Sequence, residues 1–170
     1  IDYRLKDGEN VIGVKAGLTS VAKQQAMGVN EPVYGYMTNK MLLELNTKID
    51  LSKFIHPRVE PEIVFILAND LIGSTITKED VIDATESVCC GLEIIDSRYK
   101  DFRFTLADVV ADNTSAAGFI LGEKFPISDI DLSLEGCLLK VNSEVVATAT
   151  GAAVLDHPAN AVALLARWLD

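Results

Sequence analysis

Two glutamates, Glu60 and Glu62, are separated by a single residue and stand directly before the apolar run Ile63-Val-Phe-Ile-Leu67. A short apolar run of this kind is typical of a buried β-strand. Alternate side chains of a strand share a face, so we expect both carboxylates to point the same way. A third acid, Glu93, lies between apolar residues of another such stretch, where a buried charge needs a partner. The pattern predicts three carboxylates gathered on neighbouring strands.

These three acids have the composition of a metal site. Ligation by the oxygens of Glu60, Glu62 and Glu93 suits a hard cation, Mg2+ or Mn2+, better than zinc, which prefers His and Cys. The alternative is that the first two glutamates are solvated acids at a strand end and that Glu93 pairs with Arg98. The spacing alone leaves both interpretations open.

Composition limits the classes of partner. The chain has 170 residues, 49% of them hydrophobic, and we expect residues 1–170 to form one globular domain. Its 15 basic and 25 acidic residues give a formal charge of -10 without a basic stripe, so no nucleic-acid partner is expected. Without an apolar stretch near the roughly 20 residues of a membrane span, or an apolar signal region, we expect no membrane partner and a cytoplasmic protein.

The three cysteines, Cys89, Cys90 and Cys137, lack the spacing of a disulfide framework or a zinc knuckle. We interpret all three as small buried apolar residues.

Strand and helix signals are interleaved along the chain, which predicts an α+β, β-rich mixed fold. Neither terminus resembles a natural domain boundary, so we expect a fragment that is incomplete at both ends. The expected elements are a strand over 11–15, a helix over 20–27 closed by Gly28, an irregular loop with a short strand over 31–51, a helix after Thr77 carrying Val81, Ala84, Thr85 and Val88, a strand around Glu93, a hairpin over 138–149 turning at Asn142-Ser143, and a helix from Pro158 to the end.

Five motifs occur in order: Gly13-Val-Lys-Ala-Gly-Leu-Thr-Ser20, His56-Pro-Arg-Val-Glu-Pro-Glu-Ile63, Glu93-Ile-Ile-Asp-Ser-Arg98, Val110-Ala-Asp-Asn-Thr-Ser115 and Gly151-Ala-Ala-Val-Leu-Asp-His-Pro158. This series resembles the 2-oxopent-4-enoate hydratase and 4-oxalocrotonate decarboxylase family of the fumarylacetoacetate hydrolase superfamily. The resemblance implies the C-terminal-domain fold of that superfamily, with terminal segments missing here. It also implies that residues 1–170 are a single catalytic domain and that the three glutamates hold a divalent cation.

The resemblance implies that Lys15 faces the substrate. A 2-oxo acid chelated to a cation develops negative charge on forming a dienolate, and a lysine beside it can donate or accept the proton. Without the resemblance, Lys15 is interpreted as a surface lysine whose stem covers apolar residues.

Five further residues are candidates for substrate binding: Arg98, Tyr99, Phe104, Asn113 and Ser115. Arg98 either binds a substrate carboxylate through its planar fork or ties Asp96 to the loop. The default role of Asn113 and Ser115 is local hydrogen bonding in a turn, although the resemblance implies that their segment lies near the pocket. His56 and His157, each before a proline, are interpreted as structural.

The stretch Ser97-Arg-Tyr-Lys-Asp-Phe-Arg-Phe104 is similar to decarboxylases of the family, as is His56 before Pro57. An aromatic wall that excludes water favours loss of a carboxylate, and Phe102 and Phe104 are its candidates, with ordinary core packing as the alternative. Ala149 and Asp156 stand where the family usually has glycine, which puts the local geometry in question if a positive φ is needed.

The resemblance therefore implies a metal-dependent decarboxylase of 4-oxalocrotonate (2-oxohex-3-enedioate) in catechol meta-cleavage. The sister activity, hydration of 2-hydroxypenta-2,4-dienoate, is the first alternative. Hydrolysis of a carbon-carbon bond in an acylpyruvate is a further alternative, which would need a His-based water activator that we do not locate in the sequence. A non-catalytic partner subunit is the remaining alternative. The expected partners are an unsaturated 2-oxo acid and further copies of the chain, with a complex with a sister hydratase or decarboxylase left open.

Overall fold

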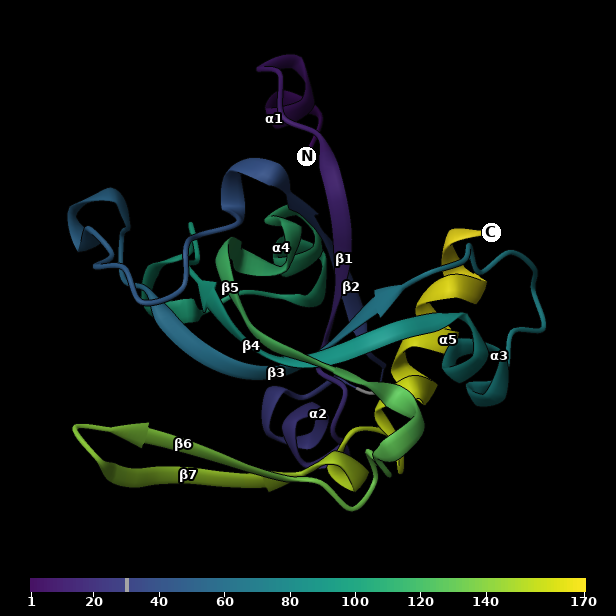
Figure 1. Ribbon diagram of the computed structural model, residues 1–170. Coiled ribbons are helices and arrows are strands. Elements are labelled where there is room, and N and C mark those ends of the chain that lie inside the picture. Colours follow the sequence, from purple (N-terminus) through teal and green to yellow (C-terminus); the bar gives the residue numbers. More distant parts are fainter. Residues whose placement is uncertain (30) are drawn as a thin grey trace. The chain divides into compact units, whose positions relative to one another are not determined.

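The computed structural model describes residues 1–29 and 31–170 (Figure 1). These residues form two compact units, each built from three chain segments. The first unit comprises residues 1–17, 32–62 and 91–122; the second comprises residues 18–31, 63–90 and 123–170. The expectation of one catalytic domain over 1–170 stays a prediction.

The first unit is organised around an antiparallel pair of strands, β1 (Val11–Gly17) and β2 (Val33–Thr38). The pair places Lys15 opposite Gly35 and Val14 opposite Tyr36. Met37, Met41 and Ala116 form a small core here, with Phe119 packed against them. Two short helices belong to the unit: α1 (Asp2–Lys6) and α4 (Leu106–Ala111).

The second unit packs two helices against each other, α3 (Lys78–Ala84) and α5 (Pro158–Leu169). Val81, Ala159 and Ala163 form the buried centre of this contact. The unit also contains α2 (Val21–Met27) and the hairpin of β6 (Gly136–Val141) and β7 (Glu144–Thr150).

A three-stranded sheet has the order β3 (Arg58–Leu67), β4 (Thr85–Ile95), β5 (Ala116–Pro126), and each strand contributes residues to both units. The strands lie side by side in Figure 1. Among the described residues, no helix is long and apolar enough to cross a membrane.

Several local predictions are confirmed. Ser20 caps α2, and Gly28 ends it in the left-handed conformation. Thr77 and Asp80 form the capping box of α3. The hairpin turns at Asn142 and Ser143, whose φ angles of 50° and 70° are those that a two-residue turn of type I′ needs.

The predicted helix after Thr77 is too long. It ends at Ala84, and Thr85 and Val88 belong to β4. The Thr85 hydroxyl donates to the carbonyl of Val81 at 2.6 Å, which satisfies one of the last helical acceptors. Thr85 and Val88 are β-branched, and pairing within the sheet outweighs their helical spacing.

The interpretation of the cysteines is also corrected. Cys89 is buried, but Cys90 is exposed and Cys137 is only partly covered. Cys90 follows Cys89 in β4, so the alternation of a strand turns their side chains to opposite faces.

The two glycine replacements have different consequences. Ala149 lies in β7 opposite Cys137, in extended backbone that alanine adopts readily. Asp156 has a φ of 66°, so it occupies the left-handed region that glycine would favour. The concern about backbone geometry therefore holds at Asp156 and not at Ala149.

Candidate metal centre

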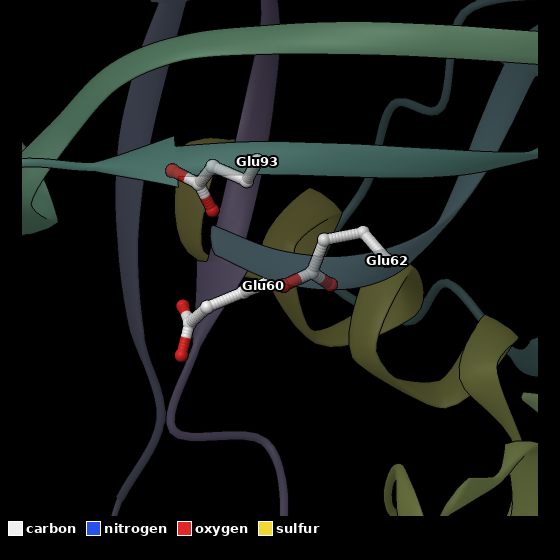
Figure 2. Close-up of side chains that lie close together, drawn as sticks. All are labelled: Glu60, Glu62 and Glu93. Carbon is white, nitrogen blue, oxygen red and sulfur yellow. The ribbon is translucent and has the colours of Figure 1, made fainter. Parts of the chain in front are cut away.

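The three glutamates converge. Glu60 and Glu62 lie on β3, two residues apart and therefore on one face, and Glu93 lies on the neighbouring strand β4. One carboxylate oxygen from each lies within 4.8 Å of the other two. Figure 2 shows the three side chains gathered on these neighbouring strands. Glu93 is buried, and the other two are partly buried. Strand alternation places the first pair, and strand order brings Glu93 to them.

Lys15 is the ionic partner of Glu93. Its Nζ lies 2.5 Å from Oε1 of Glu93, and the two side chains are only 12% and 5% exposed. The same ammonium donates to the backbone carbonyl of Thr114 at 3.2 Å. Arg98, which the alternative interpretation paired with Glu93, is engaged elsewhere. Lys15 is thus a nearly buried cation at the carboxylate cluster rather than a surface lysine.

The chemistry of the donors fits a divalent cation. Three carboxylates so close together repel one another, and a positive charge between them lowers that cost. Lys15 provides one such charge, so these four groups carry a net formal charge of minus two. Oxygen-only donors favour a hard ion such as Mg2+ or Mn2+. Glu60, Glu62 and Glu93 are the residues that would hold it.

Arg98 binds Asp112, not Asp96. Its Nε pairs with the Asp112 carboxylate, and an Nη donates to the Asp112 carbonyl at 2.5 Å. The Asp96 carboxylate instead accepts hydrogen bonds from the backbone N–H groups of Ile55 and His56, both at 2.8 Å. The expectation that Arg98 ties Asp96 to the loop is therefore wrong, because the acidic partner of Arg98 is Asp112. Arg98 and Asp112 are fourteen residues apart along the chain, and α4 ends just before Asp112 and brings it to the arginine.

Asn113 and Ser115 differ in how far along the chain their hydrogen-bond partners lie. The Asn113 amide accepts from Tyr36 N at 2.8 Å and donates to Tyr36 O at 2.9 Å. The Ser115 hydroxyl donates to Asp112, and its backbone oxygen accepts from Asp96 N. Both are candidates for substrate binding. The Ser115 hydroxyl has the local role that the sequence gives as the default, whereas the Asn113 amide binds β2, 77 positions away along the chain.

The two aromatic candidates contact each other. The rings of Tyr99 and Phe104 meet edge to face with centroids 6.4 Å apart. Loss of hydration and then the neighbouring Asp108 carboxylate raise the pKa of Tyr99 above its ordinary value. Phe102 packs separately: it stacks on His56 at 4.8 Å and lies under the guanidinium of Arg58. Phe102 and Phe104 therefore contact different side chains and do not share a partner.

Both histidines make structural contacts. The ring Nε2 of His56 lies 2.8 Å from the Ser97 carbonyl, and Nδ1 of His157 accepts from Ala159 N at 3.1 Å, which caps α5. The sequence interpretation missed two contributors to the surroundings of Lys15, Gly35 and the Thr114 carbonyl. A backbone carbonyl carries no side-chain signal, and a glycine in a strand shows its role only when its neighbour is known.

No protein-family model matches the chain. The 4-oxalocrotonate decarboxylase of Pseudomonas sp. (strain CF600) is 44% identical over 95% of this chain and 62% of its own length. The 2-hydroxypent-2,4-dienoate hydratase of Pseudomonas putida is 42% identical over 99% of this chain and 77% of its own length. The chain belongs to this hydratase and decarboxylase family. It spans less than two thirds of the length of the first of these relatives.

A solved structure agrees with this membership of the hydratase and decarboxylase family. The 4-oxalocrotonate decarboxylase from Pseudomonas putida G7, complexed with magnesium and adipate, has a TM-score of 0.94 and 40% identity over 99% of this chain and 64% of that one. At 15% identity, the fumarylpyruvate hydrolase from Pseudomonas aeruginosa has a TM-score of 0.71 over 91% of this chain and 70% of that one, which shows the fold alone. The predicted fumarylacetoacetate hydrolase type of fold is confirmed.

Proposed function

We propose that this protein is a metal-dependent lyase that removes carbon dioxide from 4-oxalocrotonate, giving 2-hydroxypenta-2,4-dienoate. The observation that carries the proposal is the nearly buried Lys15 against Glu93, within a cluster of three converging carboxylates. This arrangement occurs in a chain that is 44% identical to a 4-oxalocrotonate decarboxylase. Glu60, Glu62 and Glu93 are proposed to hold Mg2+ or Mn2+.

A divalent cation bound there supplies positive charge beside the carboxylate and keto oxygens of a 2-oxo acid, where negative charge develops. The bond to the distal carboxylate breaks, its electron pair moves through the conjugated chain to the 2-oxo oxygen, and carbon dioxide leaves. Lys15 holds the proton at Nζ that the resulting dienolate takes up. Because its side chain is 12% exposed, bulk water competes little for that proton.

Hydration of 2-hydroxypenta-2,4-dienoate is the second candidate, favoured by a hydratase relative at 42% identity. There Lys15 would give its proton to the diene before water adds. We prefer decarboxylation because of the half-buried aromatic pair Tyr99 and Phe104. This pair is proposed to exclude water from the surroundings of the distal carboxylate. The proposed surroundings of the substrate also include the segments that carry Arg98, Asn113 and Ser115.

The deciding assay uses the intact protein with Mg2+ or Mn2+. One reaction contains 2-oxohex-3-enedioate as the substrate, and a separate reaction contains 2-hydroxypenta-2,4-dienoate. Release of carbon dioxide from the first, with little change in the diene absorbance of the second, is expected. Loss of the diene absorbance without carbon dioxide release would assign the hydratase activity.

Metal binding separates both lyases from the remaining alternative, a non-catalytic partner subunit. Calorimetric titration with Mn2+ is expected to show binding that disappears in Glu60→Gln. A chain that binds no cation and turns over neither substrate would be that partner subunit. Association of several copies, or of this chain with a sister enzyme, is proposed as well, and sedimentation with and without the sister protein tests it.

A further inference from the structure

Within the described part of the chain, the ammonium of Lys15 donates to Glu93 and to a backbone carbonyl, and the carbonyl belongs to a constrained loop. Besides Glu93, Lys15 donates to the carbonyl of Thr114 at 3.2 Å. Thr114 is 5% exposed, and its segment Asn113–Ser115 follows directly on α4. The direction of this carbonyl therefore influences where Nζ of Lys15 lies.

The loop has an unusual backbone. Asn113, Thr114 and Ser115 have φ angles of 51°, 50° and 59°, three consecutive left-handed residues that are not glycine. L-amino acids adopt this region at a cost, so such a run persists only when surrounding contacts impose it. These contacts are what point the Thr114 carbonyl at Lys15.

Asn113 provides the first of them. Its amide makes two hydrogen bonds to one residue of β2, accepting from Tyr36 N at 2.8 Å and donating to Tyr36 O at 2.9 Å. This imitates the pairing of a further strand and fixes the loop to β2. Tyr36 lies opposite Val14, the neighbour of Lys15, so the loop is fastened close to the lysine along the strand pair.

Gly35 provides the second contact by having no side chain. It lies opposite Lys15 in the strand pair. A Cβ atom there would come within 2.3 Å of Thr114 Oγ1 and 2.8 Å of the Asn113 carbonyl oxygen. The second of these is backbone, so a methyl group at Gly35 would push the loop away from β2.

We propose that Asn113 and Gly35 are positioning residues for Lys15: they hold the Thr114 carbonyl where it fixes the ammonium beside Glu93. Neither is proposed to touch the reacting atoms. Asn113 was a candidate for substrate binding, and the contacts of its amide with Tyr36 give it this other role. The inference rests on the proposed function only where turnover is measured, because the placement of Lys15 is measurable without any substrate.

The first experiment measures that placement in the intact protein. Reductive methylation followed by mass spectrometry gives the labelling rate of each lysine. We expect Asn113→Ala and Gly35→Ala to raise the rate at Lys15 several-fold and to leave Lys40, whose side chain is 52% exposed, unchanged. Unchanged labelling of Lys15 in both variants would overturn the proposal, whatever the protein catalyses.

Two matched controls guard against a general effect of substitution. Asn39 also binds backbone, accepting from Asn10 N at 2.8 Å, but it lies just beyond Thr38, the end of β2, and not opposite Lys15, so Asn39→Ala should not alter the labelling. At Gly136, an added Cβ meets no described atom within 4 Å, so Gly136→Ala should behave likewise. If Asn113→Ala does not fold, Asn113→Asp keeps the acceptor for Tyr36 N and serves in its place.

The second experiment measures turnover. Displacing a proton donor by about 1 Å can cost roughly 10²-fold in rate, so Asn113→Ala should lower kcat by that order while KM changes little. In a Lys15→Ala background the same change should have almost no further effect, because it acts through the lysine. Additive losses in the double variant would overturn the proposal. If the unaltered protein turns over neither substrate, the proposed function fails and the labelling result still decides this inference.

Discussion

Lys15 donates to Glu93 across 2.5 Å, although the two residues are 78 positions apart and both side chains are nearly buried. Removing one partner of such a pair leaves the other as a buried, unsatisfied charge, which is costly. Glu93 also belongs to the carboxylate cluster with Glu60 and Glu62. It therefore connects the proposed proton donor to the proposed metal ligands, and the two roles can be separated by substitution.

Changing Glu93→Gln should weaken Mg2+ or Mn2+ binding by more than the roughly 10- to 100-fold typical of residues that only support metal ligands. The amide keeps the shape of the side chain but loses the charge that a hard cation requires. Calorimetric titration with Mn2+ measures this. Glu86→Gln is the matched control, because Glu86 is an exposed glutamate on the same strand. Equal affinities in the two variants would remove Glu93 from the site.

Changing Lys15→Ala should lower turnover by about 10²- to 10⁴-fold, the range expected for loss of an acid-base group. Metal affinity should be largely kept, since Lys15 contributes no oxygen ligand. Steady-state kinetics and a Mn2+ titration on the same preparation test both statements. Lys40→Ala, at an exposed lysine of the same unit, should change neither quantity. An unaltered rate in Lys15→Ala would mean that another group moves the proton.

His157 should make stability depend on pH. Partial burial, and then the charge of Lys78, hold the pKa of His157 below its ordinary value of 6.5. The folded protein thus favours the neutral ring, whose Nδ1 accepts from Ala159 N. This contribution is complete above pH 6.5 and is lost as the pH falls through the folded-state pKa.

The measurement is urea unfolding between about pH 7.5 and pH 5. Asparagine caps helices well without titrating, so His157→Asn should lose less stability than the unaltered protein as the pH falls. His157→Ala should cost about 0.5–2 kcal/mol at the upper pH through loss of the cap. Parallel pH profiles for the unaltered protein and His157→Asn would exclude this contribution.

Phe104→Ser should separate chemistry from binding. If the aromatic pair with Tyr99 keeps water from the distal carboxylate, the variant should release carbon dioxide from the six-carbon diacid more slowly. Its affinity for a short 2-oxo acid that lacks this carboxylate should fall less. The rate of release and the inhibition constant of the short analogue are the two measurements. Phe125→Ser, at an exposed phenylalanine, is the control; equal losses in both measurements for Phe104→Ser would indicate a folding role.

Local rules account for what the sequence predicted well. The alternation of a strand places Glu60 and Glu62 on one face, a capping box starts the helix after Thr77, and Asn142-Ser143 turns the hairpin. Each rule acts over a few residues and needs no knowledge of the rest of the chain. The error after Ala84 arose where two such rules compete, because Thr85 and Val88 fit a helical spacing but have side chains that favour a strand.

The amino-acid sequence by itself identified the candidate residues for the chemistry, the three acids and the lysine, and most of the short elements that bear them. Only the tertiary structure decided that Lys15 rather than Arg98 meets Glu93, and that Arg98 binds Asp112. It also decided that Asn113 fastens its loop to β2 beside Gly35. These pairings join segments far apart along the chain, and they depend on which strands pair and in what register. Strand pairing is a property of the whole fold, which no local spacing contains.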